Sequence, residues 1–152
     1  ANPGSRIACA LSHYTLWKNC LKENIPYLIL EHDAIFIDSI NLNILKTKFD
    51  IISINDPRRA TRKSQEYYDK IKSSPGNVIP VPIIDTFDVP QGLPGNSAYI
   101  IKPEGAKHML KLVKDYGLWP NDALMCRQLV PNLGVSTNFF TMVQLNKSTT
   151  TL

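Results

Sequence analysis

The stretch Tyr27-Leu28-Ile29-Leu30-Glu31-His32-Asp33-Ala34 joins a short, wholly apolar run to two carboxylates. Four consecutive apolar residues directly after Pro26 are typical of a strand that is buried on both faces, as in a helix-flanked parallel sheet. Open α/β sheets bind their ligands beyond the carboxyl ends of their strands. The stretch therefore predicts an α/β fold and a functional site at residues 31–33.

The segment before this strand predicts an amphipathic helix over residues 5–24. Ser5 is a suitable N-cap, and Pro26 prevents the helix from continuing. Apolar side chains recur at helical spacing and are expected to form the buried face: Ile7, Leu11, Tyr14, Trp17 and Leu21.

The rest of the chain continues to alternate helical and apolar extended segments. Residues 50–54 are expected to be a buried strand and 97–101 a further strand, whereas 78–84 contains two prolines and is expected to be an edge strand or an extended segment. Residues 135–143 are expected to be a strand. Helices are expected over 39–45 with Ser39 as cap, around 65–71, from Pro103 to Gly117, and over 121–130. The alternation predicts a layered α/β architecture in a single domain, residues 1–152.

Composition excludes several classes of protein. The chain has 152 residues, of which 43% are hydrophobic and 20% charged, unlike a disordered, collagenous or disulfide-stapled chain. Its three cysteines form no CxxC or zinc-finger spacing, which favours a reducing, cytoplasmic location. No apolar run reaches the ~18 residues of a membrane span, and no signal-peptide pattern is present.

The net charge of +4 comes from a single segment of the chain. Residues 58–72 contain six basic and two acidic residues, which leaves eleven of each in the rest of the chain. A neutral remainder argues against a nucleic-acid-binding surface. The basic segment also contains Tyr67 and Tyr68, so it could grip phosphates or stack on sugar or base rings; the alternative is a solvated, charged loop.

Glu31, His32 and Asp33 form the sharpest chemical feature. Carboxylates and water are the ligands that Mg²⁺ and Mn²⁺ prefer, and an imidazole is a further ligand. The alternative is a polar strand end whose charges are solvated.

Two further features carry candidate residues. The loop Gln91–Ser97 contains Gly95 and Asn96 before a strand, and its glycines would let a ligand approach the backbone; a tight structural turn is the alternative. Asp122, at the start of an expected helix, is either a helix-capping charge or a general base. His13 is expected to be a structural hydrogen-bonding group, and His108 to lie on the surface.

Three stretches together resemble glycosyltransferase family 25, which contains lipopolysaccharide-biosynthesis transferases. They are Ser5-Arg6-Ile7-Ala8-Cys9-Ala10-Leu11-Ser12-His13, then Ile29-Leu30-Glu31-His32-Asp33-Ala34, and then Gly95-Asn96-Ser97-Ala98-Tyr99-Ile100-Ile101-Lys102-Pro103-Glu104-Gly105-Ala106. Their order and spacing agree with the family over residues ~5–130.

The resemblance implies a Rossmann-like, GT-A type mixed sheet flanked by helices, and a nucleotide-sugar donor such as UDP-galactose bound with Mn²⁺ or Mg²⁺. Glu31, His32 and Asp33 would then hold the metal. Asp122 would be the base that activates a hydroxyl of a glycan or protein acceptor. The donor-binding residues would be Ser12, His13, Glu31, Gly95 and Asn96.

The chain also departs from the family pattern. Arg6 stands where the family usually has Glu, Ala8 replaces a glycine, and His32 replaces the middle acid of the acidic triplet. The chain begins at the family's first helix, so the sheet is expected to lack the usual N-terminal strand. Two alternatives to the enzyme therefore remain. One is a non-catalytic sugar- or nucleotide-binding module, alone, as a homo-oligomer or beside a partner chain; the other is a polyanion-binding protein that uses residues 58–72.

Overall fold

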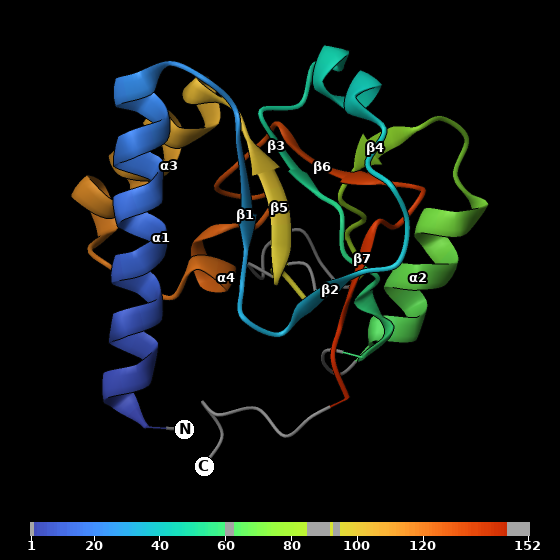
Figure 1. Ribbon diagram of the computed structural model, residues 1–152, viewed down its shortest axis with the longest axis horizontal. Helices are drawn as coiled ribbons and strands as arrows, with labels where there is room; N and C mark the ends of the chain where they lie inside the picture. Colours follow the sequence, from blue (N-terminus) through green and yellow to red (C-terminus); the bar gives the residue numbers. More distant parts are fainter. Residues whose placement is uncertain (1, 60–62, 85–91, 93–94, 146–152) are drawn as a thin grey trace.

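The computed structural model describes residues 2–59, 63–84, 92 and 95–145. The chain forms a mixed five-stranded sheet in the order β1-β5-β3-β6-β4 and a separate two-stranded sheet of β2 and β7 (Figure 1). The elements are α1 (Pro3–Glu23), β1 (Tyr27–Leu30), β2 (Ala34–Phe36), η1 (Leu42–Lys46), β3 (Ile51–Ser53), η2 (Pro57–Arg59), α2 (Ser64–Ser73), β4 (Val78–Pro80), β5 (Ala98–Ile101), α3 (Pro103–Tyr116), α4 (Asn121–Leu124), β6 (Leu133–Ser136) and β7 (Thr141–Val143). The predicted α/β class and mixed sheet are confirmed.

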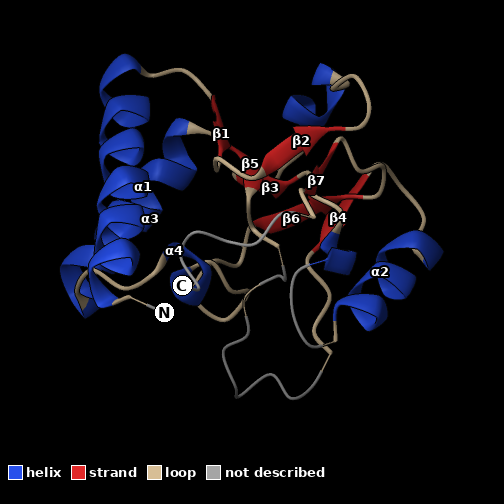
Figure 2. Ribbon diagram, turned by 60° about the horizontal axis from the view of Figure 1, so that its bottom comes forward, coloured by secondary structure: helices blue, strands red, loops and turns tan. Residues whose placement is uncertain are grey.

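The two faces of the five-stranded sheet are covered differently. Side chains alternate along β5, so Tyr99 and Ile101 face a core shared with α1, α2 and α3, while Ala98 and Ile100 face a second core. The second core is closed by η1 and by Phe140 beside β7. Figure 2 shows α1 and α3 side by side, with α2 at the other end of the sheet. Helices thus line one face, and the opposite face is covered by irregular segments and the small sheet.

The carboxyl ends of β1, β3 and β6 all lie at the same end of the sheet. β1 and β3 are each antiparallel to β5, and β3 is parallel to β6, so these three strands run in the same direction. The strands predicted at 50–54 and 97–101 are present as β3 and β5. Strand β4 lies at an edge of the sheet, as its proline predicts. The end of β1 is therefore a place where this topology can position a ligand.

The prediction that Tyr27–Leu30 is buried on both faces is wrong. β1 is an edge strand, it pairs antiparallel with β5, and only Ile29 is fully buried; Leu28 and Leu30 are each 42% exposed. Uniformly apolar sequence reports hydrophobicity but not the number of neighbouring strands.

The predicted face of the first helix is wrong for Ile7, Leu11 and Leu21, whereas Trp17 is buried and Tyr14 is half-buried against the core. Helix α1 buries Ala10, His13, Trp17 and Cys20, whereas Ile7 and Leu11 are exposed. The buried side chains recur at spacings of three and four, so they form one stripe that faces Tyr99 and α3. The imidazole of His13 and the indole N–H of Trp17 both form hydrogen bonds with the Tyr99 hydroxyl. The periodicity of apolar residues alone could not predict that a histidine would be buried in this stripe.

Several boundaries differ from prediction for local reasons. Asn2, not Ser5, caps α1, because its side chain accepts a hydrogen bond from the Gly4 amide. The helix expected over 39–45 is the 3₁₀ segment η1, capped by Asn41. The expected strand 135–143 is divided into β6 and β7. Helix α4 ends at Leu124 rather than near residue 130, because the backbone of Cys126 forms a bridge with Gly92. Among the described residues, no helix is both long and apolar enough to span a membrane.

Candidate active site

The acidic triplet forms the turn that follows β1. The Ala34 amide donates to the Glu31 carbonyl at 3.1 Å, and the Glu31 amide donates to the Ser97 carbonyl at 2.7 Å. Glu31 and Asp33 are half-buried, whereas His32 is exposed at the tip of the turn. The two carboxylates are thus closer to the protein interior than the imidazole between them.

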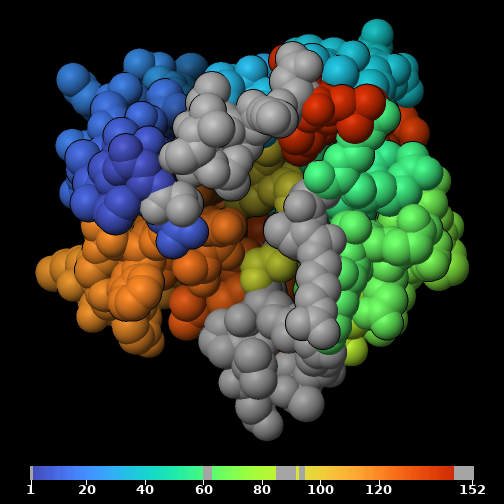
Figure 3. Space-filling model, turned by 90° about the horizontal axis from the view of Figure 1, so that it is seen from below, coloured from blue at the N-terminus to red at the C-terminus, as the bar shows by residue number. Residues whose placement is uncertain are grey.

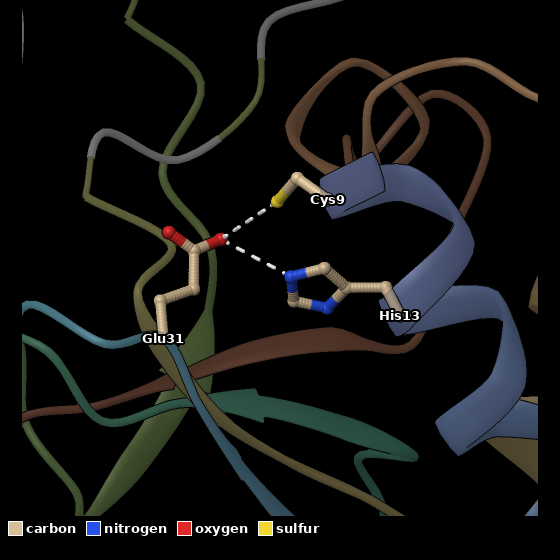
Figure 4. Close-up of side chains that lie close together, drawn as sticks. All are labelled: Cys9, His13 and Glu31. Atoms are coloured by element: carbon tan, nitrogen blue, oxygen red, sulfur yellow. Dashed lines mark hydrogen bonds and ion pairs between the residues drawn. The ribbon is translucent and has the colours of Figure 1, made fainter. Parts of the chain in front are cut away.

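Glu31 is held from the side by helix α1. Its Oε1 lies 3.1 Å from His13 Nε2 and 3.9 Å from Cys9 Sγ (Figure 4). Cys9 and His13 are four residues apart on the helix, so they project from the same face toward the strand end. The sequence interpretation included His13 and Glu31 but missed Cys9, although the spacing of Cys9 and His13 on an expected helix was a usable signal.

A buried chain of hydrogen bonds fixes His13. Trp17 Nε1 donates to the Tyr99 hydroxyl at 3.0 Å, and this hydroxyl lies 2.6 Å from His13 Nδ1. An ionised Glu31 can only accept, so His13 Nε2 carries the proton that it donates and Nδ1 accepts from Tyr99. Burial raises the pKa of Tyr99, which keeps the hydroxyl a donor. The prediction of a structural, hydrogen-bonded His13 is confirmed, and its contact with Glu31 places it beside the candidate metal ligands.

The environment of Cys9 is acidic. Burial, together with the charges of Glu31, Asp122 and Asp33, raises the pKa of its thiol to about 11. A Coulombic effect of this kind requires that these carboxylates lie near the sulfur. The fold therefore brings Asp122, which is distant in sequence, to the same region as the two acids of the strand-end turn.

Asp33 offers an uncommitted oxygen at this site. Its Oδ1 is buried, and within the described part of the chain no group forms a hydrogen bond with it. A buried carboxylate oxygen without a partner is costly, and a bound cation or ordered water is the usual compensation. The donor set therefore fits a hard divalent cation.

The glycine loop packs against the segment that carries Asp122. A Cβ on Gly92 would collide with the Asp122 carbonyl oxygen, so only glycine allows this approach. Asn96 Nδ2 lies 3.0 Å from Met125 Sδ, and Gly95 adopts a φ of 71°. Asp122 itself is exposed in the first turn of α4. Gln91, Leu93 and Pro94 lie outside the described residues.

The space-filling view from below looks onto this end of the molecule (Figure 3). The amino-terminal part of α1, in blue, lies next to the orange segment that contains α4, and the surface is hollowed between the orange and green segments. Residues from both ends of the sequence thus border this face.

Ser12 and His108 lie outside this cluster, and only His108 differs from expectation. Ser12 is exposed, and its hydroxyl donates to the Ala8 carbonyl of its own helix at 2.9 Å. His108 is half-buried rather than on the surface, because its Nε2 lies 2.7 Å from the Leu129 carbonyl.

Part of the basic segment is occupied by contacts within the chain. Arg58 forms a forked salt bridge with Asp56, 2.7 Å between Nη2 and Oδ2, and stacks over the ring of Tyr68. Lys72 donates to the Thr137 carbonyl at 2.8 Å. Arg62 lies outside the described residues. These contacts give Arg58 and Lys72 structural roles at the carboxyl end of β3.

Asp56 makes the free energy of unfolding depend on pH in the acidic range. Burial would raise the pKa of Asp56, but the hydrogen bonds and charge of Arg58 outweigh it and hold the pKa below its usual value. A lowered folded pKa contributes stability above the unfolded pKa of about 3.9, and this stability disappears as the pH falls through the folded pKa.

We therefore expect Asp56→Asn to lower the melting temperature at pH 7 and to reduce its further fall below pH ~4. The measurement is thermal unfolding across this range, with the exposed Asp69→Asn on α2 as the matched control. An Asp56→Asn protein with the same acid profile as the parent chain would contradict the assignment.

Comparison with known proteins identifies the family of the chain. No solved structure gives a significant match. The chain is 29% identical to the lipooligosaccharide biosynthesis protein lex-1 of Haemophilus influenzae (strain ATCC 51907 / DSM 11121 / KW20 / Rd), over 91% of this chain and 46% of the relative. The chain thus spans about half the length of this curated relative. The model of the family described as "Glycosyltransferase family 25 (LPS biosynthesis protein)" matches residues 4–125, a range that holds the helix, the strand-end acids, the glycine loop and Asp122. The chain therefore belongs to glycosyltransferase family 25.

Proposed function

We propose that this chain takes part in moving a hexose, galactose in the first instance, from a nucleotide sugar such as UDP-galactose to a hydroxyl acceptor in lipopolysaccharide or another glycan. The observation that carries the proposal is the pair of acids at the carboxyl end of β1, where Glu31 contacts Cys9 and His13 and the buried Asp33 Oδ1 has no hydrogen-bond partner among the described residues. The proposal includes a GT-A type donor site and a reducing, cytoplasmic setting.

The reaction we propose depends on Mn²⁺ or Mg²⁺. Asp33 and Glu31 would hold the cation, with His32 adjacent in the turn, because carboxylate oxygens are the ligands these hard ions prefer. When bound, the cation neutralises the charge that develops on the departing diphosphate.

The remaining residues have separate tasks in this proposal. His13 holds Glu31 in one orientation through its Nε2 proton, and Tyr99 holds His13. Asp122, which is exposed, accepts the proton of the acceptor hydroxyl. Gly95 and Asn96 line the donor sugar beside Asp122, and Ser12 and His13 lie on the nucleotide side.

Calorimetric titration of the chain with UDP-galactose tests the donor site. We expect binding that requires Mn²⁺. Asp33→Asn is expected to weaken this binding by about 10–100-fold, because the negatively charged carboxylate that contains the unpartnered Oδ1 is replaced by a neutral amide. Asp38→Asn, an exposed carboxylate beyond β2, is the matched control and should bind like the parent chain.

Two outcomes would contradict the proposal. The absence of any heat with UDP or UDP-galactose in the presence of Mn²⁺ would exclude this donor. Binding that is unchanged in Asp33→Asn, without sugar transfer, would instead favour a non-catalytic binding module.

A further inference from the structure

We propose that Cys9, His13 and Glu31 form a binding site for a borderline-soft divalent cation, Zn²⁺ in the first instance. This site overlaps the hard-cation site of the proposed function at Glu31 and differs from it in using a thiol and an imidazole from α1. The proposal concerns metal binding to the free chain and does not depend on sugar transfer.

The three potential ligand atoms already lie at metal-binding separation. Cys9 Sγ, His13 Nε2 and one Glu31 carboxylate oxygen all lie within 4.8 Å of one another. Oε1 of Glu31 is 3.1 Å from the imidazole nitrogen and 3.9 Å from the sulfur. Tetrahedral zinc, with bonds of about 2.0–2.3 Å, separates its ligand atoms by roughly 3.3–3.7 Å. Only small side-chain movements would therefore complete the three-ligand set.

The positions of these residues in the fold favour such a set. Two ligands spaced four residues apart on α1 point toward the third, which comes from the end of β1 (Figure 4). His13 is 3% exposed, and Cys9 and Glu31 are half-buried, so one side of the cluster faces the protein and the other remains accessible. Three protein ligands with an open fourth position are an arrangement that zinc commonly adopts.

The chemistry of the ligands selects the kind of ion. A sulfur, a nitrogen and an oxygen suit Zn²⁺ or Co²⁺, whereas Mg²⁺ and Mn²⁺ bind thiolates poorly. The neighbouring charges of Asp33 and Asp122 favour any cation at this place. Selection of zinc over manganese therefore depends on Cys9.

Tyr99 supplies the outer contact that zinc-binding histidines usually have. In the metal-free chain His13 Nε2 lies 3.1 Å from Glu31 Oε1, and Nδ1 lies 2.6 Å from the Tyr99 hydroxyl. With the metal on Nε2, the imidazole proton would reside on Nδ1 and be donated to the Tyr99 oxygen, which also accepts from Trp17, and the Tyr99 O–H would turn away from Nδ1; the thiol proton of Cys9 would pass to solvent.

Cobalt substitution tests the site directly. We titrate the reduced chain with Co²⁺ in the absence of any sugar nucleotide, and we measure retained Zn²⁺ after dialysis. The expected result is a near-ultraviolet sulfur-to-cobalt charge-transfer band that Zn²⁺ abolishes and excess Mg²⁺ does not. Cys9→Ser is expected to remove the band, and Tyr99→Phe to weaken binding by about tenfold.

Matched variants make the result specific. Cys20→Ser changes a cysteine of the same helix whose thiol faces the Ile25 carbonyl, so it should keep the band. Glu31→Gln should weaken zinc binding while leaving the sulfur band detectable at high Co²⁺. Circular dichroism of each variant establishes that it is folded.

Either of two results would overturn the proposal. One is a folded parent chain that gives no thiolate band and retains no zinc; the cluster would then be a hydrogen-bonded contact only. The other is a band that persists in Cys9→Ser, which would place the metal elsewhere. Neither result bears on donor binding, which the Mn²⁺ titration with UDP-galactose measures separately.

Discussion

Replacing Asp122 with asparagine is expected to lower the turnover number for sugar transfer by about 10²–10⁴-fold while leaving KM for the nucleotide sugar nearly unchanged. A general base acts on the acceptor hydroxyl in the transition state, so its loss affects the chemical step more than donor binding. Asp122 is suited to this task because its carboxylate is exposed and lies near the acids that follow β1. The expectation rests on the proposed function.

The decisive measurement is the turnover number and KM of sugar transfer at one fixed pH in the parent chain and in Asp122→Asn. The variant should show a strongly reduced turnover number with nearly the parent KM for the nucleotide sugar, and added small anionic bases such as azide or formate should restore part of the rate. Asp115→Asn, an exposed carboxylate that pairs with Lys111 on α3, is the control and should keep the parent turnover number. Equal turnover numbers for Asp122→Asn and the parent would exclude Asp122 as the base.

Replacing Gly105 with alanine is expected to destabilise the fold by about 2–3 kcal/mol. Gly105 lies in α3, where a Cβ would be 2.6 Å from the Asp50 carbonyl oxygen and 2.8 Å from Ile51 Cγ1. The carbonyl cannot withdraw easily, because it accepts a hydrogen bond of 2.8 Å from the Lys102 amide. The better helix propensity of alanine, at most about 1 kcal/mol, offsets only part of this cost.

Thermal or urea unfolding measures the effect. A loss of this size corresponds to a fall of roughly 5–10 °C in the melting temperature for a chain of this length. The control is Gly4→Ala in the first turn of α1, where the nearest atom is a flexible side-chain oxygen at 3.3 Å and little change is expected. A Gly105→Ala protein as stable as the parent would show that α3 does not pack this closely against the start of β3.

Local patterns were sufficient for much of the fold. Residues 103–116 follow the prediction from Pro103 to Gly117, because proline favours the first helical turn and glycine favours the end. The buried strands at β3 and β5 also follow from short apolar runs. The acids after Leu30 could be recognised because their position depends only on where a strand ends.

Burial was less predictable wherever it depends on a distant partner. The exposed side chains of Leu28 and Leu30 are as apolar as the buried side chain of Ile29. Strand alternation places Ile29 on the face of the sheet that packs in the core with the helices, and Leu28 and Leu30 on the opposite face. On α1 the fold buries His13 and leaves Leu11 exposed, because Tyr99 supplies the partner that a buried imidazole needs.

The sequence by itself therefore determined the α/β class, the main helices and strands, and the placement of Glu31 and Asp33 beyond a strand. Periodicity and capping are properties of adjacent residues, so they can be read along the chain. Only the tertiary structure decided that Cys9 and His13 contact Glu31, and that Asp122 lies near them. These contacts join residues separated by about 20–110 positions, and their geometry is set by how α1, β1 and α4 pack, which no local pattern encodes.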